Sequence, residues 1–221
     1  MSMDYSVLFM DAAEYTRGAF SGRWKDVLML LVSLIIFPLI PVFFGHLARV
    51  MRGEKPAPSV EWSWRSYADG IKLLVIWFFY TLPAIVAGIL LFGYVLVVYE
   101  MEGVKAIEPV LPEIIGGFLV VFVVYIFTAL IANLAGVRFA RERRFFAAFS
   151  VRTIWGLVDR IGFWDYVIAV VLVSAFMNAI IAVIALIPVD IVVFVLEVLA
   201  FIPLVVFQAR YFSRVYDLAM E

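Results

Sequence analysis

Residues 117–138 read GFLVVFVVYIFTALIANLAGVR, and no charge occurs in this stretch before Arg138. An α-helix rises ~1.5 Å per residue, so the stretch is long enough to cross a hydrocarbon core of ~30 Å. Three further segments are similarly long and mostly apolar. The sequence therefore predicts an all-α, polytopic integral membrane helical bundle. Its four full transmembrane helices are expected at residues 71–99, 113–139, 164–187 and 190–210.

The composition favours the same class. Hydrophobic residues make up 66% of the chain and charged residues 16%, whereas soluble domains average about 45–50% and about 25%. A water-exposed globule is thereby excluded. With 221 residues, the chain is expected to form a single membrane domain over residues 1–221. The absence of cysteine excludes disulfides and thiolate metal sites.

The distribution of charge predicts the topology, because Lys and Arg near the ends of spans mark cytoplasmic loops. The loop at residues 100–113 is acidic, and the turn at 188–190 has no positive charge. Both are expected outside. Basic residues follow or precede the apolar segments at residues 17–25, 51–72, 138–163 and 210–214. We expect these regions inside, which makes both termini cytoplasmic and the protein a multi-pass component of the plasma membrane.

Residues 27–50 are apolar but are divided by Pro38 and Pro41. A single crossing would place the basic flank at residues 17–25 outside, against the rule. A re-entrant hairpin with its apex at the prolines resolves this conflict; a kinked fifth span is the alternative. A weak internal repeat favours the hairpin. The N-terminal and C-terminal parts each contain an amphipathic helix, a Gly-x-Trp segment and an apolar hairpin broken at proline, in that order. Ala48-Arg49 and Ala209-Arg210 close the two hairpins, and Ala140-Arg141 ends the middle span.

Residues 4–22 and 145–162 show helical amphipathicity, with apolar side chains on one face and charged side chains on the other. In the first segment Asp11, Glu14 and Arg17 lie opposite the apolar face. Both segments are predicted to be interfacial helices in the cytoplasmic headgroup layer. The alternative is that they form a docking surface for a cytosolic partner.

A few polar side chains fall inside the predicted spans. Glu197 and Asn178 are expected at similar depths on neighbouring antiparallel helices, so a hydrogen bond between them is geometrically possible. They form either a structural pair or a proton or cation relay. Asn133 lies nearer the cytoplasmic end, and His46, the only histidine, is expected to be interfacial rather than catalytic.

The basic region after residue 137 offers candidate contacts for anionic lipid or a partner, although the same charges also serve as a plain topology signal. The candidates are Arg138, Arg141, Arg143, Arg144, Arg152 and Arg160.

Motifs that carry chemistry are missing from the sequence. It contains no metal-ligand cluster, no Gly-x-Ser-x-Gly and no Walker loop. No catalytic, cofactor-binding or metal site is predicted, and the chain is expected not to be an enzyme. Expected partners are membrane lipids, a second copy or another membrane protein, and not nucleic acid. The leading hypothesis is a non-enzymatic membrane scaffold; the alternative is a small transporter or channel component that uses Glu197 and Asn178.

Several short motifs carry a resemblance to a known family. They include DYSVLF and DAAEY near the N-terminus, SGRWKD, the stretch GHLARVMRGEKPAP at residues 45–58, and GVRFARERRFFAAF at residues 136–149. The chain resembles the DUF4013 family of uncharacterised membrane proteins, found mainly in archaea. His46 stands where the family pattern leads us to expect Tyr. The resemblance implies an archaeal plasma-membrane protein and transfers no catalytic residues.

Overall fold

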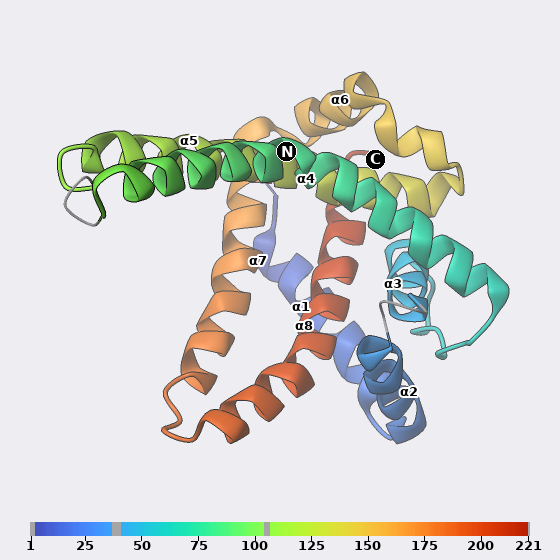
Figure 1. Ribbon diagram of the computed structural model, residues 1–221. Helices are drawn as coiled ribbons and strands as arrows, with labels where there is room; N and C mark the ends of the chain where they lie inside the picture. Colours follow the sequence, from blue (N-terminus) through green and yellow to red (C-terminus); the bar gives the residue numbers. More distant parts are fainter. Residues whose placement is uncertain (1–2, 37–40, 104–106, 221) are drawn as a thin grey trace. The chain divides into compact units, whose positions relative to one another are not determined.

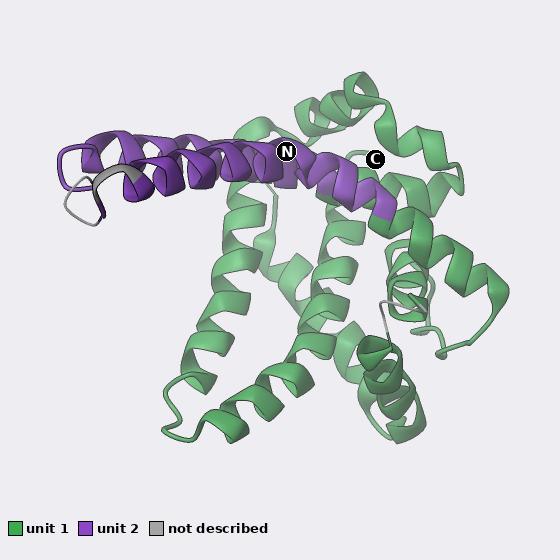
Figure 2. Cartoon of the chain, viewed as in Figure 1, with its two compact units in different colours: residues 1–74, 133–221 green, residues 75–132 purple. Residues whose placement is uncertain are grey.

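The computed structural model describes residues 3–36, 41–103 and 107–220, and within these ranges the regular secondary structure is helical (Figure 1). By its internal contacts the chain divides into two compact units (Figure 2). Unit 1 comprises residues 1–74 and 133–221, and unit 2 comprises residues 75–132. The single membrane domain over 1–221 stays a prediction.

Four of the described helices are long and apolar enough to cross a membrane, which confirms the predicted fold class. They are α4 (Trp64–Glu102), α5 (Leu111–Glu142), α7 (Phe163–Ile184) and α8 (Asp190–Leu218).

Two of these helices extend beyond their predicted bounds by more than a full helical turn. α4 begins at Trp64 rather than at 71, because the Ser63 hydroxyl accepts a hydrogen bond from the Ser66 backbone amide at 3.2 Å and caps the first turn. α8 continues to Leu218 rather than ending at 210. Its last turns, which lie beyond the predicted end at 210, are largely buried against α1, α3 and α6.

Unit 2 consists of the outer parts of α4 and α5 (Figure 2). The two helices lie close together, since a Cβ added at Gly117 would be 2.5 Å from a Leu91 methyl carbon. Most of their remaining apolar side chains are exposed, with Leu90 at 70% and Phe118 at 62%. A continuous apolar surface of this kind is unfavourable in water and is the expected outer surface of membrane-spanning helices.

The core of unit 1 lies around the C-terminal half of α8. The helices α1 (Tyr5–Phe20) and α3 (Val42–Met51) both pack against it. Phe9 on α1 contacts Phe176 on α7 and Tyr211 on α8, with ring centroids 5.5 and 5.2 Å apart. The predicted amphipathic segment 4–22 therefore packs its apolar face on α8, while its placement in the headgroup layer stays a prediction.

The segment at residues 27–50 contains two short helices. α2 (Trp24–Ile35) ends before the prolines and α3 begins after them; the apex at Pro38 falls outside the described residues. The flanks of the segment are bonded to each other. Arg23 donates to the Ala57 carbonyl at 2.8 Å, and the Val60 amide donates to Asp26 at 3.3 Å. The two ends of the segment therefore lie close together. The re-entrant placement of α2 and α3 in a membrane stays a prediction.

The segment predicted as one helix at 145–162 is divided. A short 3₁₀ helix, η2 (Phe145–Phe149), precedes α6 (Val151–Ile161), which ends at Gly162 with a φ of 95° that favours glycine. α6 packs on α7 and α8 through a buried face. Arg152 and Arg160 are exposed, so the predicted segregation of polar and apolar faces is confirmed. The buried face consists of Ile154, Leu157, Val158 and Ile161.

Candidate functional site

A buried ion pair joins the N-terminal helix to the last helix of unit 1. Arg210 on α8 is 1% exposed and donates two hydrogen bonds to the Asp11 carboxylate on α1, at 2.7 and 3.1 Å. The Tyr15 ring lies 4.7 Å from the Arg210 guanidinium carbon. A two-pronged bond to a carboxylate and an aromatic face together satisfy a guanidinium that water does not reach.

Asp11 is shared by further cations. Lys55 lies 3.0 Å and Arg214 lies 3.7 Å from the same carboxylate oxygen. Partial burial acts to raise the pKa of Asp11, but the hydrogen bonds from Arg210 and Lys55 outweigh it and hold this pKa below its ordinary value of 3.8. Burial raises the pKa of the neighbouring Tyr15 to about 12. Asp11 is therefore a carboxylate and Tyr15 a neutral phenol at neutral pH.

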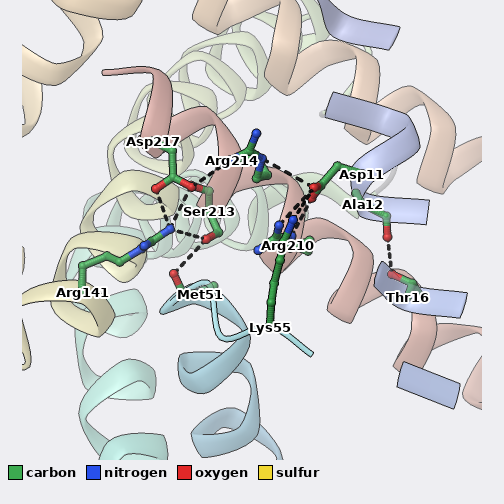
Figure 3. A network of polar contacts seen from close by, with 10 residues as sticks. All are labelled: Asp11, Ala12, Thr16, Met51, Lys55, Arg141, Arg210, Ser213, Arg214 and Asp217. Atoms are coloured by element: carbon green, nitrogen blue, oxygen red, sulfur yellow. Dashed lines mark hydrogen bonds and ion pairs between the residues drawn. The ribbon is translucent and has the colours of Figure 1, made fainter. Parts of the chain in front are cut away.

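The contacts continue from Arg214 to α5 and α3 (Figure 3). Asp217 accepts from Arg214 at 3.3 Å and from Arg141 at 2.6 Å. Arg141 also donates to the Ser213 hydroxyl at 2.9 Å, and that hydroxyl donates to the Met51 carbonyl at 3.0 Å. We call the side chains of Asp11, Lys55, Arg141, Arg210, Ser213, Arg214 and Asp217 the ionic network.

The arginines of the Ala-Arg pairs all join separate segments of unit 1. Arg141 and Arg210 belong to the ionic network, and Arg49 contacts Glu54 at 3.3 Å and Glu61 at 3.2 Å. The arginines of this sequence repeat therefore have a structural role, because they hold separate segments of unit 1 together. Sequence reasoning missed the acid partners, because Asp11 was expected on the charged face of its helix and Asp217 lies beyond the predicted end of the last span.

The candidate lipid contacts do not gather at one place. Arg141 is engaged in the ionic network, and Arg138 pairs with Glu142 of its own helix at 2.6 Å. The other candidates are exposed and make no ion pair with any residue that the structure describes. These are Arg143, Arg144, Arg152 and Arg160.

These arginines also line different cavities. Arg138 and Arg160 line a cavity of about 310 Å³ together with Thr153 and Tyr216. Arg143 lines a different cavity, of about 320 Å³. The predicted cluster of arginines is therefore divided between at least two cavities, each lined by residues of different helices.

A cavity of about 740 Å³ lies between the start of α1, the junction of α6 and α7, and the end of α8. Its wall has charges of both signs, including Asp4, Asp165 and Arg214. The Tyr5 hydroxyl donates to Asp165 at 3.0 Å beside it. A cavity lined by apolar side chains and by charges of both signs favours no single class of ligand.

The polar candidates inside the spans are not brought together. Asn178 is exposed and donates to the Ser174 carbonyl of its own helix at 2.8 Å. Glu197 is half-buried and makes no hydrogen bond or ion pair with any described residue. The expected Asn178–Glu197 hydrogen bond is therefore not formed, since the helix itself offers the amide an acceptor one turn away.

The remaining polar candidates are dispersed as well. Asn133 is half-buried and forms no side-chain hydrogen bond within the described ranges. His46 was expected at an interface but is 5% exposed, and its Nδ1 has no partner among the described residues. Neither residue lines a cavity described above.

No curated protein and no solved structure matches the chain. The family described as "Protein of unknown function (DUF4013)" matches residues 28–189. The match runs from α2 to the turn after α7, which is most of the chain, and leaves Asp11 and Arg210 outside it. The motif-based resemblance is thereby confirmed: this chain, with its four apolar helices long enough to span a bilayer, belongs to the DUF4013 family of membrane proteins of unknown function.

Proposed function

We propose that the protein is a non-enzymatic membrane scaffold, in which membrane helices hold a charged surface that binds lipid or a partner protein. The ionic network carries this proposal. It links α1, the segment after α3, the end of α5 and α8, which are far apart in the sequence.

The chemistry of the network suits a structural role. A catalytic or transporting group must change its protonation state or its partner during the cycle. Arginine stays protonated at all accessible pH values, and the pKa of Asp11 is held low. Groups of this kind stabilise one arrangement of helices instead of relaying protons.

The binding surface of the scaffold is the polar face of α6 and the adjoining end of α5. Arg144, Arg152 and Arg160 are exposed there without an ion pair to any described residue. Such charges attract anionic lipid headgroups or an acidic protein surface. We place this surface, and both termini, on the cytoplasmic side of the plasma membrane.

The test combines photo-crosslinking with flux measurements. A photo-reactive residue at Thr153, on the exposed face of α6, is expected to give a defined lipid or protein adduct in intact cells. The adduct should disappear in R152Q/R160Q and persist in Lys25→Gln, whose exposed cation lies outside α6. Purified protein in liposomes should conduct no more protons than protein-free liposomes. A proton flux that Glu197→Gln removes would contradict the scaffold.

A small transporter is the second candidate, and Glu197 favours it. An ionisable side chain within a span is by default a functional hypothesis, and Glu197 has no bond to a described residue that would make it a structural partner. For a transporter, Glu197→Gln should abolish the flux while Asp190→Asn, at the start of the same helix, leaves it unchanged. No flux in the wild-type protein would remove this candidate.

A further inference from the structure

A second basic feature of unit 1 lies outside the ionic network. The residue that caps α3, the first turns of α4 and the residue that follows α5 surround a cavity of about 320 Å³. Its charged lining consists of Arg52, Arg65, Asp69, Lys72 and Arg143. Four cations and one acid thus face a space large enough for a small anionic group.

The cavity has a fixed wall and an unpaired rim. Arg52 pairs with Asp69, and both side chains are largely buried, at 10% and 14% exposure. Arg52 also donates to the Ala140 carbonyl at 3.1 Å, which ties this wall to α5. The rim cations are exposed and have no carboxylate partner within the described residues. They are Arg65, Lys72 and Arg143.

The rim cations do not stabilise one another, because all three carry the same charge. Arg65 and Lys72 lie two turns apart on one face of α4 and point the same sign of charge at the cavity. Arg143 adds a third charge from another segment. Exposed like charges ~10 Å apart along a helix repel one another only weakly in water, and an anion bound between the three cations would attract each of them.

The backbone of Arg143 supplies an independent observation. Its φ is 55°, in the left-handed region that glycine or asparagine adopts more readily than arginine. Its amide donates to the Phe139 carbonyl at 2.9 Å and closes the end of α5. Local geometry alone therefore favours glycine here, whereas an anion in the cavity would account for a guanidinium at this position.

We propose that this cavity binds a phosphate group, carried by an anionic lipid headgroup or by soluble phosphate. Guanidinium groups donate paired hydrogen bonds to phosphate oxygens, and a lysine adds a mobile charge. The apolar part of α4 begins at Leu73, directly after Lys72, so a lipid headgroup is the source that the position favours. None of these residues belongs to the ionic network on which the proposed scaffold rests.

Thermal unfolding of the full chain in neutral detergent tests the site. The probes are short-chain phosphatidylglycerol, the matching phosphatidylcholine and inorganic phosphate. Phosphatidylglycerol is expected to raise the melting temperature of the wild-type protein more than phosphatidylcholine does. Arg65→Gln and Lys72→Gln should each weaken the apparent affinity about fivefold, the effect of removing one charge near an anionic headgroup. Stabilisation by inorganic phosphate at equal concentration would identify soluble phosphate as the source.

Arg143→Gly separates binding from folding. Glycine suits the left-handed backbone, so the ligand-free melting temperature should stay equal or rise. The affinity for phosphatidylglycerol should nevertheless fall about fivefold. Lys25→Gln is the control, since this exposed lysine lies on α2, outside both the cavity and the polar face of α6. An equal loss in the control, or no stabilisation of the wild-type protein by either phosphate source, would overturn the proposal.

Discussion

Arg210 illustrates how a charge at the end of a membrane helix becomes part of the interior. Positive residues at such ends are usually topology signals in contact with water and headgroups, but α1 covers this one almost completely. A guanidinium removed from water is tolerable only when a counter-charge and hydrogen-bond acceptors replace the solvent. Asp11 supplies both, so the helix pairing and the charge pairing depend on each other.

Replacement of Asp11 by Asn should therefore destabilise the protein by about 3 kcal/mol or more, because it leaves Arg210 buried without a counter-charge. Unfolding in detergent, followed by circular dichroism, measures the loss. Lys55→Gln removes a partner that is 59% exposed, and its effect should stay below about 1 kcal/mol. Equal effects of the two substitutions would mean that the buried bond to Arg210 has no special weight.

Stability should also fall in acid for the same reason. The pKa of Asp11 is lower in the folded chain than its ordinary value of 3.8, so the unfolded chain binds the proton first. The stabilisation by Asp11 is complete above pH 3.8 and is lost as the pH falls through the folded pKa. A pH series of unfolding midpoints should show this acid limb in the wild-type protein and a smaller one in Asp11→Asn. An identical limb in both would assign it to other carboxyl groups.

At the scale of elements, α3 and the first turns of α4 approach so closely that glycine is required. A Cβ at Gly45 would lie 1.9 Å from the Ser66 carbonyl oxygen, and one at Gly70 would lie 1.9 Å from the Pro41 carbonyl oxygen. In both cases the obstacle is backbone, which cannot rotate away. The contact thus depends on two glycines, one on each helix.

Gly45→Ala should accordingly cost about 1–3 kcal/mol or more, since the helices must separate to admit one methyl group. Gly18→Ala is the matched control, because nothing lies within 4 Å of its added Cβ and alanine is the better helix former by about 0.5–1 kcal/mol. Unfolding midpoints of the two variants should move in opposite directions. A neutral Gly45→Ala would show that α3 and α4 are not in close contact.

At the scale of the whole molecule, the contacts restrict the topology. α1 lies against the C-terminal half of α8, so we expect the N-terminal helix and the end of the chain on one side of the membrane. The hydrogen bond from Arg23 to Ala57 likewise keeps the two flanks of residues 27–50 together. The basic residues in these regions predict that the shared side is the cytoplasm.

Single cysteines introduced at Ser21 and Met220, both exposed, provide the measurement in this cysteine-free chain. Neither should react with an impermeant thiol reagent in intact cells, and both should react after the membrane is permeabilised. A cysteine at Val189, in the turn between α7 and α8, should react from outside. Labelling of the Ser21→Cys variant but not of the Met220→Cys variant in intact cells would mean that residues 27–50 cross the membrane once.

The class of protein, the four long apolar helices and the break at the prolines could be predicted from the residues alone. These features follow from local properties. A helix that crosses a bilayer must be apolar along its length. Proline removes a backbone donor and clashes with the preceding turn, which favours a break between two short apolar helices. The separation of the polar and apolar faces of α6 was equally readable, because helical periodicity alone specifies it.

The roles of the charged residues, in contrast, depend on how the helices pack. Asp11, Arg141, Arg210 and Asp217 are distant in the sequence, and their pairing arises only when α1, α5 and α8 meet. The same holds for the cavity that collects Arg65, Lys72 and Arg143. The number of basic residues near the end of a span is enough to predict on which side of the membrane a loop lies. An ion pair, however, needs two particular side chains within about 4 Å of each other. That distance is set by packing, which no single segment encodes.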